Sequence, residues 1–133
     1  MSVGVLLITH ENVGSSLLES LKLIWKNSLP LPIKVLPIRH ENDPVEFRYH
    51  AKTICKSLNH GQGVLVLTDL FAATPCRIAS DLITNCRVRV VAGVNLPMLF
   101  KIMNYYDNDL DTLANKAVSG GCQGVLDVNS AIQ

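Results

Sequence analysis

A histidine and an aspartate each follow a short apolar run of the sequence. His10 comes directly after a run that begins at Val3, and Asp69 comes directly after a run that begins at Gly63. A carboxylate that hydrogen-bonds one ring nitrogen of an imidazole fixes the tautomer and leaves the other nitrogen free to attack. The two residue types therefore suit nucleophilic chemistry, with His10 as the nucleophile and Asp69 as the group that orients it.

The residues around this pair suit a phosphate group. Thr74-Pro75 has the composition of a helix start, because Thr is a common N-cap and Pro is favoured at the first helical position. A helix start offers unpaired N–H groups, which together with a hydroxyl favour a phosphate dianion. Phosphoryl transfer needs mainly positioning and charge stabilisation, so such a sparse site suffices. We take Thr74 and Thr9 as the candidate phosphate-binding residues.

Each of these residues also has an ordinary structural explanation. A histidine after a strand is more often a solvated loop residue, an aspartate there commonly caps a turn, and Thr-Pro commonly just begins a helix. The joint placement of His10, Asp69 and Thr74 is what favours a site. His40, which follows the second predicted strand, is a weaker candidate residue for the same site. A zinc site from His10, His40 and Asp69 lacks any local ligand spacing, so we expect no metal and no cofactor.

The elements that must position these groups follow from apolar patterning. The runs lack strict alternation, and each precedes a helical pattern, which is typical of parallel strands covered on both faces. We therefore predict an α/β fold with a doubly wound, mainly parallel four-stranded sheet of order 2-1-3-4. Ligands of such sheets bind between the first and third strands, beyond their carboxyl ends. The predicted strands are Val3–Thr9, Ile33–Ile38, Gly63–Thr68 and Val88–Val94.

Helices are predicted between and after these strands, on both faces of the sheet. An apolar stripe marks the first, and caps or prolines mark the starts of the others. A pair of glycines is expected to end the last helix, and a short edge strand is expected after it. The markers in chain order are Leu17, Leu18, Leu21, Ile24 and Trp25; Asp43-Pro44-Val45-Glu46; Thr74-Pro75; Leu96-Pro97; Asp111; Gly120-Gly121; and the strand Gly124–Val128.

Composition limits the class of protein. The 133 residues suit a single domain over 1–133, and 17% are charged against a typical share of about 25%, which favours self-association. The formal charge of +1 supports neither a nucleic acid nor a membrane partner. The first residues show no basic leader and no spanning segment, so we expect a cytoplasmic protein.

Three segments together resemble one known family. They are Thr9-His10 at the end of the first strand, Val66-Leu67-Thr68-Asp69 followed by Ala73-Thr74-Pro75, and the most distinctive segment, Val91-Ala92-Gly93-Val94-Asn95-Leu96-Pro97-Met98-Leu99. With them, nearly the whole chain resembles the IIA component of the mannose family of the bacterial sugar phosphotransferase system.

The resemblance implies a function and an assembly. A histidine at the position of His10 is phosphorylated by phospho-HPr, an aspartate matching Asp69 hydrogen-bonds the ring, and Thr74 lies near the phosphoryl group. The chain would then be a protein-histidine phosphotransferase that passes its phosphoryl group to a IIB component for sugar uptake. The family fold adds a C-terminal antiparallel strand, exchanged between the subunits of a homodimer, and Gly124–Val128 would be that strand.

Two departures from the family pattern leave a second function open. Glu11 follows the histidine where the family often has Gly, and Phe71-Ala72-Ala73 replaces an aromatic residue followed by two glycines. The alternative is a regulatory module whose His10 phosphorylation state controls a partner protein. A third class, a flavodoxin-like or receiver-like binding domain, is disfavoured because the chain has no Gly-rich phosphate loop, and a receiver would usually place acidic residues after the first strand.

Overall fold

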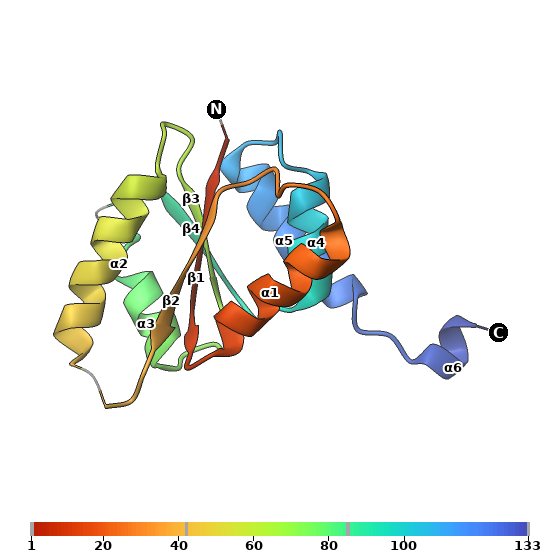
Figure 1. The fold of residues 1–133 in the computed structure, drawn as a ribbon, viewed down its shortest axis with the longest axis horizontal. Helices are drawn as coiled ribbons and strands as arrows, with labels where there is room; N and C mark the ends of the chain where they lie inside the picture. The colour runs from red at the N-terminus through yellow and green to blue at the C-terminus, as the bar shows by residue number, and fades with distance from the viewer. Residues whose placement is uncertain (1, 42, 85, 133) are drawn as a thin grey trace.

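The computed structural model describes residues 2–41, 43–84 and 86–132, and a parallel sheet lies at its centre (Figure 1). Its strands are β1 (Gly4–His10), β2 (Ile33–Ile38), β3 (Val64–Thr68) and β4 (Val88–Ala92). The strand order is β2-β1-β3-β4, and every neighbouring pair is parallel. The predicted sheet is therefore confirmed, and β1 and β3 lie side by side at the point where the order reverses.

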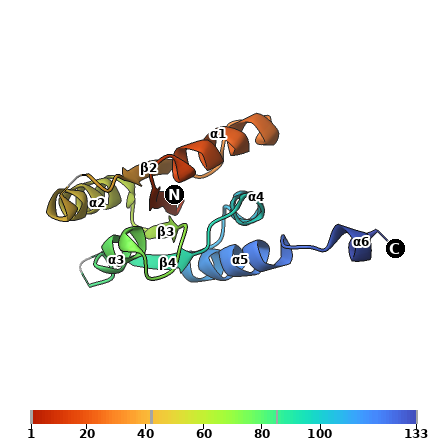
Figure 2. The ribbon, with the colours of Figure 1, turned by 90° about the horizontal axis from the view of Figure 1, so that it is seen from below.

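Helices follow the strands along the chain, and those before the C-terminal segment cover both faces of the sheet (Figure 1). They are α1 (Val13–Trp25), α2 (Pro44–Leu58), α3 (Thr74–Ser80), α4 (Leu96–Asn104), α5 (Leu110–Gln123) and α6 (Val128–Ala131). α2 and α3 lie on one face, and α1, α4 and α5 lie on the other, as Figures 1 and 2 both show. The prediction of helices on both faces is confirmed.

Two apolar cores, one on each face, explain why the strands lack alternation. In β1, Val5 and Leu7 pack with α1, α4 and α5, whereas Leu6 and Ile8 pack with α2 and α3. Successive side chains of a strand point to opposite faces, so a strand that is buried on both sides is apolar throughout. By the same alternation Thr9 falls on the α1 side of the sheet and His10 on the side of α2 and α3.

The strand register brings the two candidate loops to the same edge. Ile8 of β1 pairs with Thr68 of β3, and β1 continues to His10, which pairs with Ile38 of β2. Asp69 follows Thr68 directly, so it lies beside the last residues of β1. Three loops, those after β1, β2 and β3, therefore meet beyond the carboxyl ends of their strands.

The predicted C-terminal strand is wrong for the chain as described. Residues 124–127 belong to no helix or strand, and Val128–Ala131 form the short helix α6. This segment extends away from the body of the fold in both views (Figures 1 and 2). A strand forms only where a neighbour can bond its backbone. None of the described strands lies beside this segment.

Two helix starts differ by one or two residues from the predicted ones. Asp109 caps α5 by accepting a hydrogen bond from the Thr112 N–H at 2.9 Å, so Asp111 lies in the first turn. Ala73 is the residue that precedes α3, and Thr74 is its first residue. In both cases two polar residues or turn residues stand close together, and the pattern does not say which of them begins the helix.

The glycine pair does not end α5 as predicted, because it has a packing role. α5 continues to Gln123, and Gly120 and Gly121 are buried within it. A Cβ at Gly120 would overlap the Lys101 side chain of α4, and one at Gly121 would lie 2.9 Å from Met98 Cε. These glycines allow α4 and α5 to approach closely.

Asn95 ties this helix pair together and offers a test of the fold. Its side chain accepts a hydrogen bond from the Met98 N–H at 2.9 Å and donates one to the Gly121 carbonyl at 3.2 Å. We expect Asn95→Ala to lower the free energy of unfolding by about 1–2 kcal/mol, because it removes an N-cap and an interhelical hydrogen bond. Urea denaturation measures this change, and an unchanged midpoint would contradict the bridging role.

Candidate phosphoryl-transfer site

The imidazole of His10 and the carboxylate of Asp69 are in direct contact. Asp69 Oδ2 lies 3.0 Å from His10 Nδ1 and also accepts a hydrogen bond from the His10 backbone N–H at 3.0 Å. One carboxylate oxygen therefore holds both the ring and the chain that carries it. With Nδ1–H donating to the carboxylate, Nε2 of the neutral ring has a free lone pair. The structure thus brings together the two residues that the sequence singled out.

The two side chains differ in their access to solvent. The side chain of Asp69 is 14% exposed, whereas that of His10 is 44% exposed. Asp69 Oδ1 is buried, and no hydrogen-bond partner for it lies among the described residues. A carboxylate shielded in this way interacts more strongly with its one partner than it would in water. The ring of His10 is therefore accessible to solvent, whereas most of the Asp69 side chain lies within the fold.

A cavity of about 430 Å³ opens beside His10 on the side of α2 and α3. This placement agrees with the strand alternation, which turns His10 toward those helices. Thr74, the first residue of α3, also lines this cavity. His40 also lines the cavity, as expected from its place after β2. The lining residues are His10, Glu11, Ile38, Arg39, His40, Pro44, Phe47 and Thr74.

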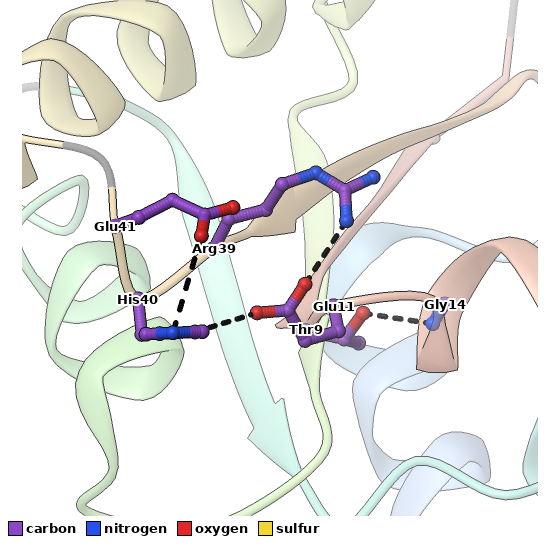
Figure 3. Close-up of polar contacts among 6 residues, drawn as sticks. All are labelled: Thr9, Glu11, Gly14, Arg39, His40 and Glu41. Carbon is purple, nitrogen blue, oxygen red and sulfur yellow. Dashed lines mark hydrogen bonds and ion pairs between the residues drawn. The ribbon is translucent and has the colours of Figure 1, made fainter.

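Thr9 does not fit its predicted contact with phosphate. It is fully buried, and its hydroxyl accepts a hydrogen bond from the Gly14 N–H at 2.8 Å, drawn in Figure 3. A Cβ at Gly14 would lie 2.7 Å from Thr9 Oγ1, so this close approach requires a glycine. Thr9 anchors the first turn of α1 to the end of β1. The alternation of strand side chains already separates Thr9 from the face of His10.

Glu11 and Arg39 are the residues of this site that the sequence analysis did not connect. Arg39 donates to Glu11 Oε2 at 3.0 Å, and His40 Nδ1 lies 3.1 Å from Glu11 Oε1 (Figure 3). The hydrogen bond with His40 is the main reason that the pKa of Glu11 lies below its ordinary value, and Arg39 lowers this pKa further. The predicted strand order could have indicated that these two residues lie close together, because each directly follows one of two neighbouring strands.

The loops on either side of His10 contain uncommon backbone conformations. Glu11 has a φ of 40° and Ala72 a φ of 66°, both in the left-handed region that non-glycine residues rarely adopt. Glu11 and Ala72 are two of the three positions at which the sequence departs from the glycine pattern of the resembling family, and the third is Ala73. Strained residues of this kind persist where the surrounding structure fixes them, and they concentrate at functional sites.

Comparison with known proteins agrees with this geometry. The family model described as the PTS system fructose IIA component, of the mannose type, matches residues 4–118. The chain belongs to this family. It is 28% identical over 129 residues to the PTS system mannose-specific EIIAB component of Escherichia coli strain K12. That match covers 94% of the chain and 39% of the relative, so the chain spans well under half the length of such relatives.

Solved structures give the same result for this IIA chain. The mannose/sorbose specific IIA subunit of Enterococcus faecalis superposes with a TM-score of 0.83 at 26% identity, over 96% of this chain and 95% of the other. The PTS IIA protein associated with the fucose utilization operon of Streptococcus pneumoniae has the same fold, with a TM-score of 0.83 at 24% identity and full coverage of both chains. The resemblance seen in the three sequence segments is confirmed.

Two further observations concern metal-binding groups and membrane-spanning helices. In the part of the chain that the structure describes, no group of three or more His, Cys, Asp or Glu side chains is placed to hold a metal ion. Within the same residues, the helices are too short or too polar to cross a bilayer. The groups that the site itself offers are an imidazole, a partly buried carboxylate, a hydroxyl and the charged residues at its rim.

The contact between His10 and Asp69 predicts a particular tautomer. We expect the neutral ring of His10 to carry its proton on Nδ1, which two-bond ¹H–¹⁵N correlation spectra of the imidazole detect directly. In Asp69→Asn the amide can donate its own N–H to Nδ1, so the proton should move to Nε2. A ring that carries its proton on Nε2 in the unsubstituted protein would contradict the orienting role of Asp69.

Proposed function

We propose that this chain is a phosphocarrier in which His10 accepts a phosphoryl group from phospho-HPr and passes it to a IIB component. The observation that carries the proposal is the bond between His10 Nδ1 and the partly buried carboxylate of Asp69, which leaves Nε2 free, while His10 lines an open cavity. Membership of the IIA family supports the donor and the acceptor. The E. coli relatives carry both A and B in the name EIIAB, which supports a IIB acceptor.

The transfer step requires little from the protein. The lone pair of His10 Nε2 attacks phosphorus, and a bond from nitrogen to phosphorus forms. The bond that joins phosphorus to the donor breaks, and its electron pair stays with the donor. The ring gains positive charge, which Asp69 stabilises through the Nδ1–H hydrogen bond. Transfer to the acceptor repeats the step in the opposite direction, with Nε2 as the leaving group.

Thr74 is the residue that we assign to phosphate binding. It lines the same cavity as His10, and its hydroxyl can donate to a phosphoryl oxygen. Phosphoryl transfer depends on positioning and charge stabilisation, so a hydroxyl at the right place contributes without any covalent role.

We also propose that the chain forms a homodimer. The C-terminal segment extends from the body and exposes several apolar side chains. Contact of these side chains with water is unfavourable, and a cluster of them is typical of an interface with another protein chain. The low share of charged residues, 17%, agrees with a surface that is partly covered by another copy. The exposed residues are Val125, Leu126, Val128 and Ile132.

The phosphocarrier proposal is tested by incubation with phosphoenolpyruvate, enzyme I and HPr, followed by measurement of the intact mass. We expect the protein to gain the mass of one phosphoryl group, which acid treatment removes. His10→Ala should gain none, because it lacks the nucleophile. His50→Ala is the matched control, since it removes another imidazole, from an exposed position on α2, and should be phosphorylated normally. Acid-labile phosphorylation of His10→Ala would refute the proposal.

A further inference from the structure

A cluster of charged side chains stands at the rim of the His10 cavity. Glu11, in the loop after β1, bonds Arg39 through Oε2 and His40 through Oε1, and both partners come from the loop after β2 (Figure 3). All three residues line the cavity together with His10. The Glu11 carboxylate is therefore held by two separate partners, one on each of its oxygens.

Stability alone does not explain this arrangement. The side chains of Arg39 and Glu11 are 41% and 44% exposed, and ion pairs between such exposed groups contribute little to folding. Glu11 nevertheless holds a left-handed backbone conformation, with its N–H donating to the Ile38 carbonyl at 3.0 Å. The bonds to Arg39 and His40 hold the Glu11 carboxylate between the cavity and the loop after β2. This local structure therefore serves to place the charges of Glu11 and Arg39 at the rim of the cavity.

Charge balance indicates what the cluster is for, given the phosphocarrier function proposed above. Among the described residues that line the cavity, Arg39 is the one whose side chain is positively charged at every ordinary pH. In the unphosphorylated protein the charge of Glu11 balances it. A phosphoryl group on His10 adds up to two negative charges to a cavity that already has Glu11 at its rim. Arg39 is then the one permanently charged cation among the described lining residues that is available to both anions.

We propose that Arg39 is an exchangeable phosphate-binding residue. In the unphosphorylated state its guanidinium is held by Glu11, and in the phosphorylated state it moves to the phosphoryl oxygens of His10. The planar fork of arginine matches two oxygens of a phosphate, which makes it a stronger partner than one exposed carboxylate oxygen. Glu11 keeps its bond to His40 through Oε1 and is not left unpaired. Glu11 therefore positions Arg39 at rest and competes with the phosphoryl group for it.

Exchange and a static ion pair make opposite predictions for two substitutions. If the pair only maintains the shape of the rim, removing either charge disturbs the site in the same direction. If Arg39 moves to the phosphoryl group, Arg39→Gln weakens the phosphorylated state, whereas Glu11→Gln removes a competitor and a repelling charge and strengthens it. The sign of the Glu11→Gln effect thus separates the two explanations.

The test is the equilibrium of phosphoryl exchange between this protein and a limiting amount of phospho-HPr. We expect Arg39→Gln to shift the equilibrium toward phospho-HPr by about tenfold, the loss typical of one hydrogen bond to a charged group. Arg39→Lys should lose less, because it keeps the charge without the fork. Glu11→Gln should shift the equilibrium the other way, by about threefold. The matched control is Arg89→Gln, which removes an exposed arginine that pairs with Asp111 at 2.9 Å.

The outcomes separate this inference from the proposed function. If the unsubstituted protein takes up no phosphoryl group, the phosphocarrier function itself is wrong. If it is phosphorylated but Arg39→Gln leaves the equilibrium unchanged, or Glu11→Gln shifts it in the same direction as Arg39→Gln, the exchange is refuted and the function stands. The side-chain Nε–H resonance of Arg39 should also move on phosphorylation while that of Arg89 does not. An Arg39 resonance that does not move would equally overturn the exchange.

Discussion

The hydrogen bond between His10 and Asp69 is the interaction on which the site depends. The two residues are 59 positions apart, and the bond exists because β1 and β3 are parallel neighbours whose carboxyl ends meet at one edge. Two apolar cores, one on each face, pack that sheet against α2 and α3 on one side and against α1, α4 and α5 on the other. The fold therefore supplies a carboxylate that is largely shielded from solvent, and a histidine whose side chain is 44% exposed.

The surrounding residues divide into those that hold the ring and those that face the cavity. Thr9 points to the α1 face and ties the end of β1 to Gly14, which keeps the chain before His10 in place. Thr74 and the pair of Glu11 and Arg39 lie on the opposite face, where a transferred group would arrive. The alternation of side chains along β1 thus places the anchoring residue Thr9 on one face of the sheet and the cavity residues on the other. Glu11, which has a left-handed backbone conformation, adds a charged group to the residues that face the cavity.

Much of this arrangement could be predicted from the sequence, and the exceptions have physical causes. Continuous apolar runs predict the strands, and the predicted strand order places His10 and Asp69 at the same edge of the sheet. Thr9 does not lie on the face of His10, because side chains alternate between the two faces of β1. The bond of Glu11 to Arg39 depends on how far two long side chains reach, which no spacing reveals. A C-terminal strand needs a neighbouring strand to bond its backbone. None of the described strands lies beside residues 124–127, so they form no strand here.

In the proposed mechanism Asp69 occupies Nδ1 of His10 and so directs the phosphoryl group to Nε2. The most direct test is a pair of spectra of the phosphorylated protein, a two-bond ¹H–¹⁵N correlation and a ³¹P spectrum, which together report the nitrogen that carries phosphorus. We expect phosphorus on Nε2 of His10, with the proton retained on Nδ1. Phosphorus on Nδ1, or on any other residue, would contradict it.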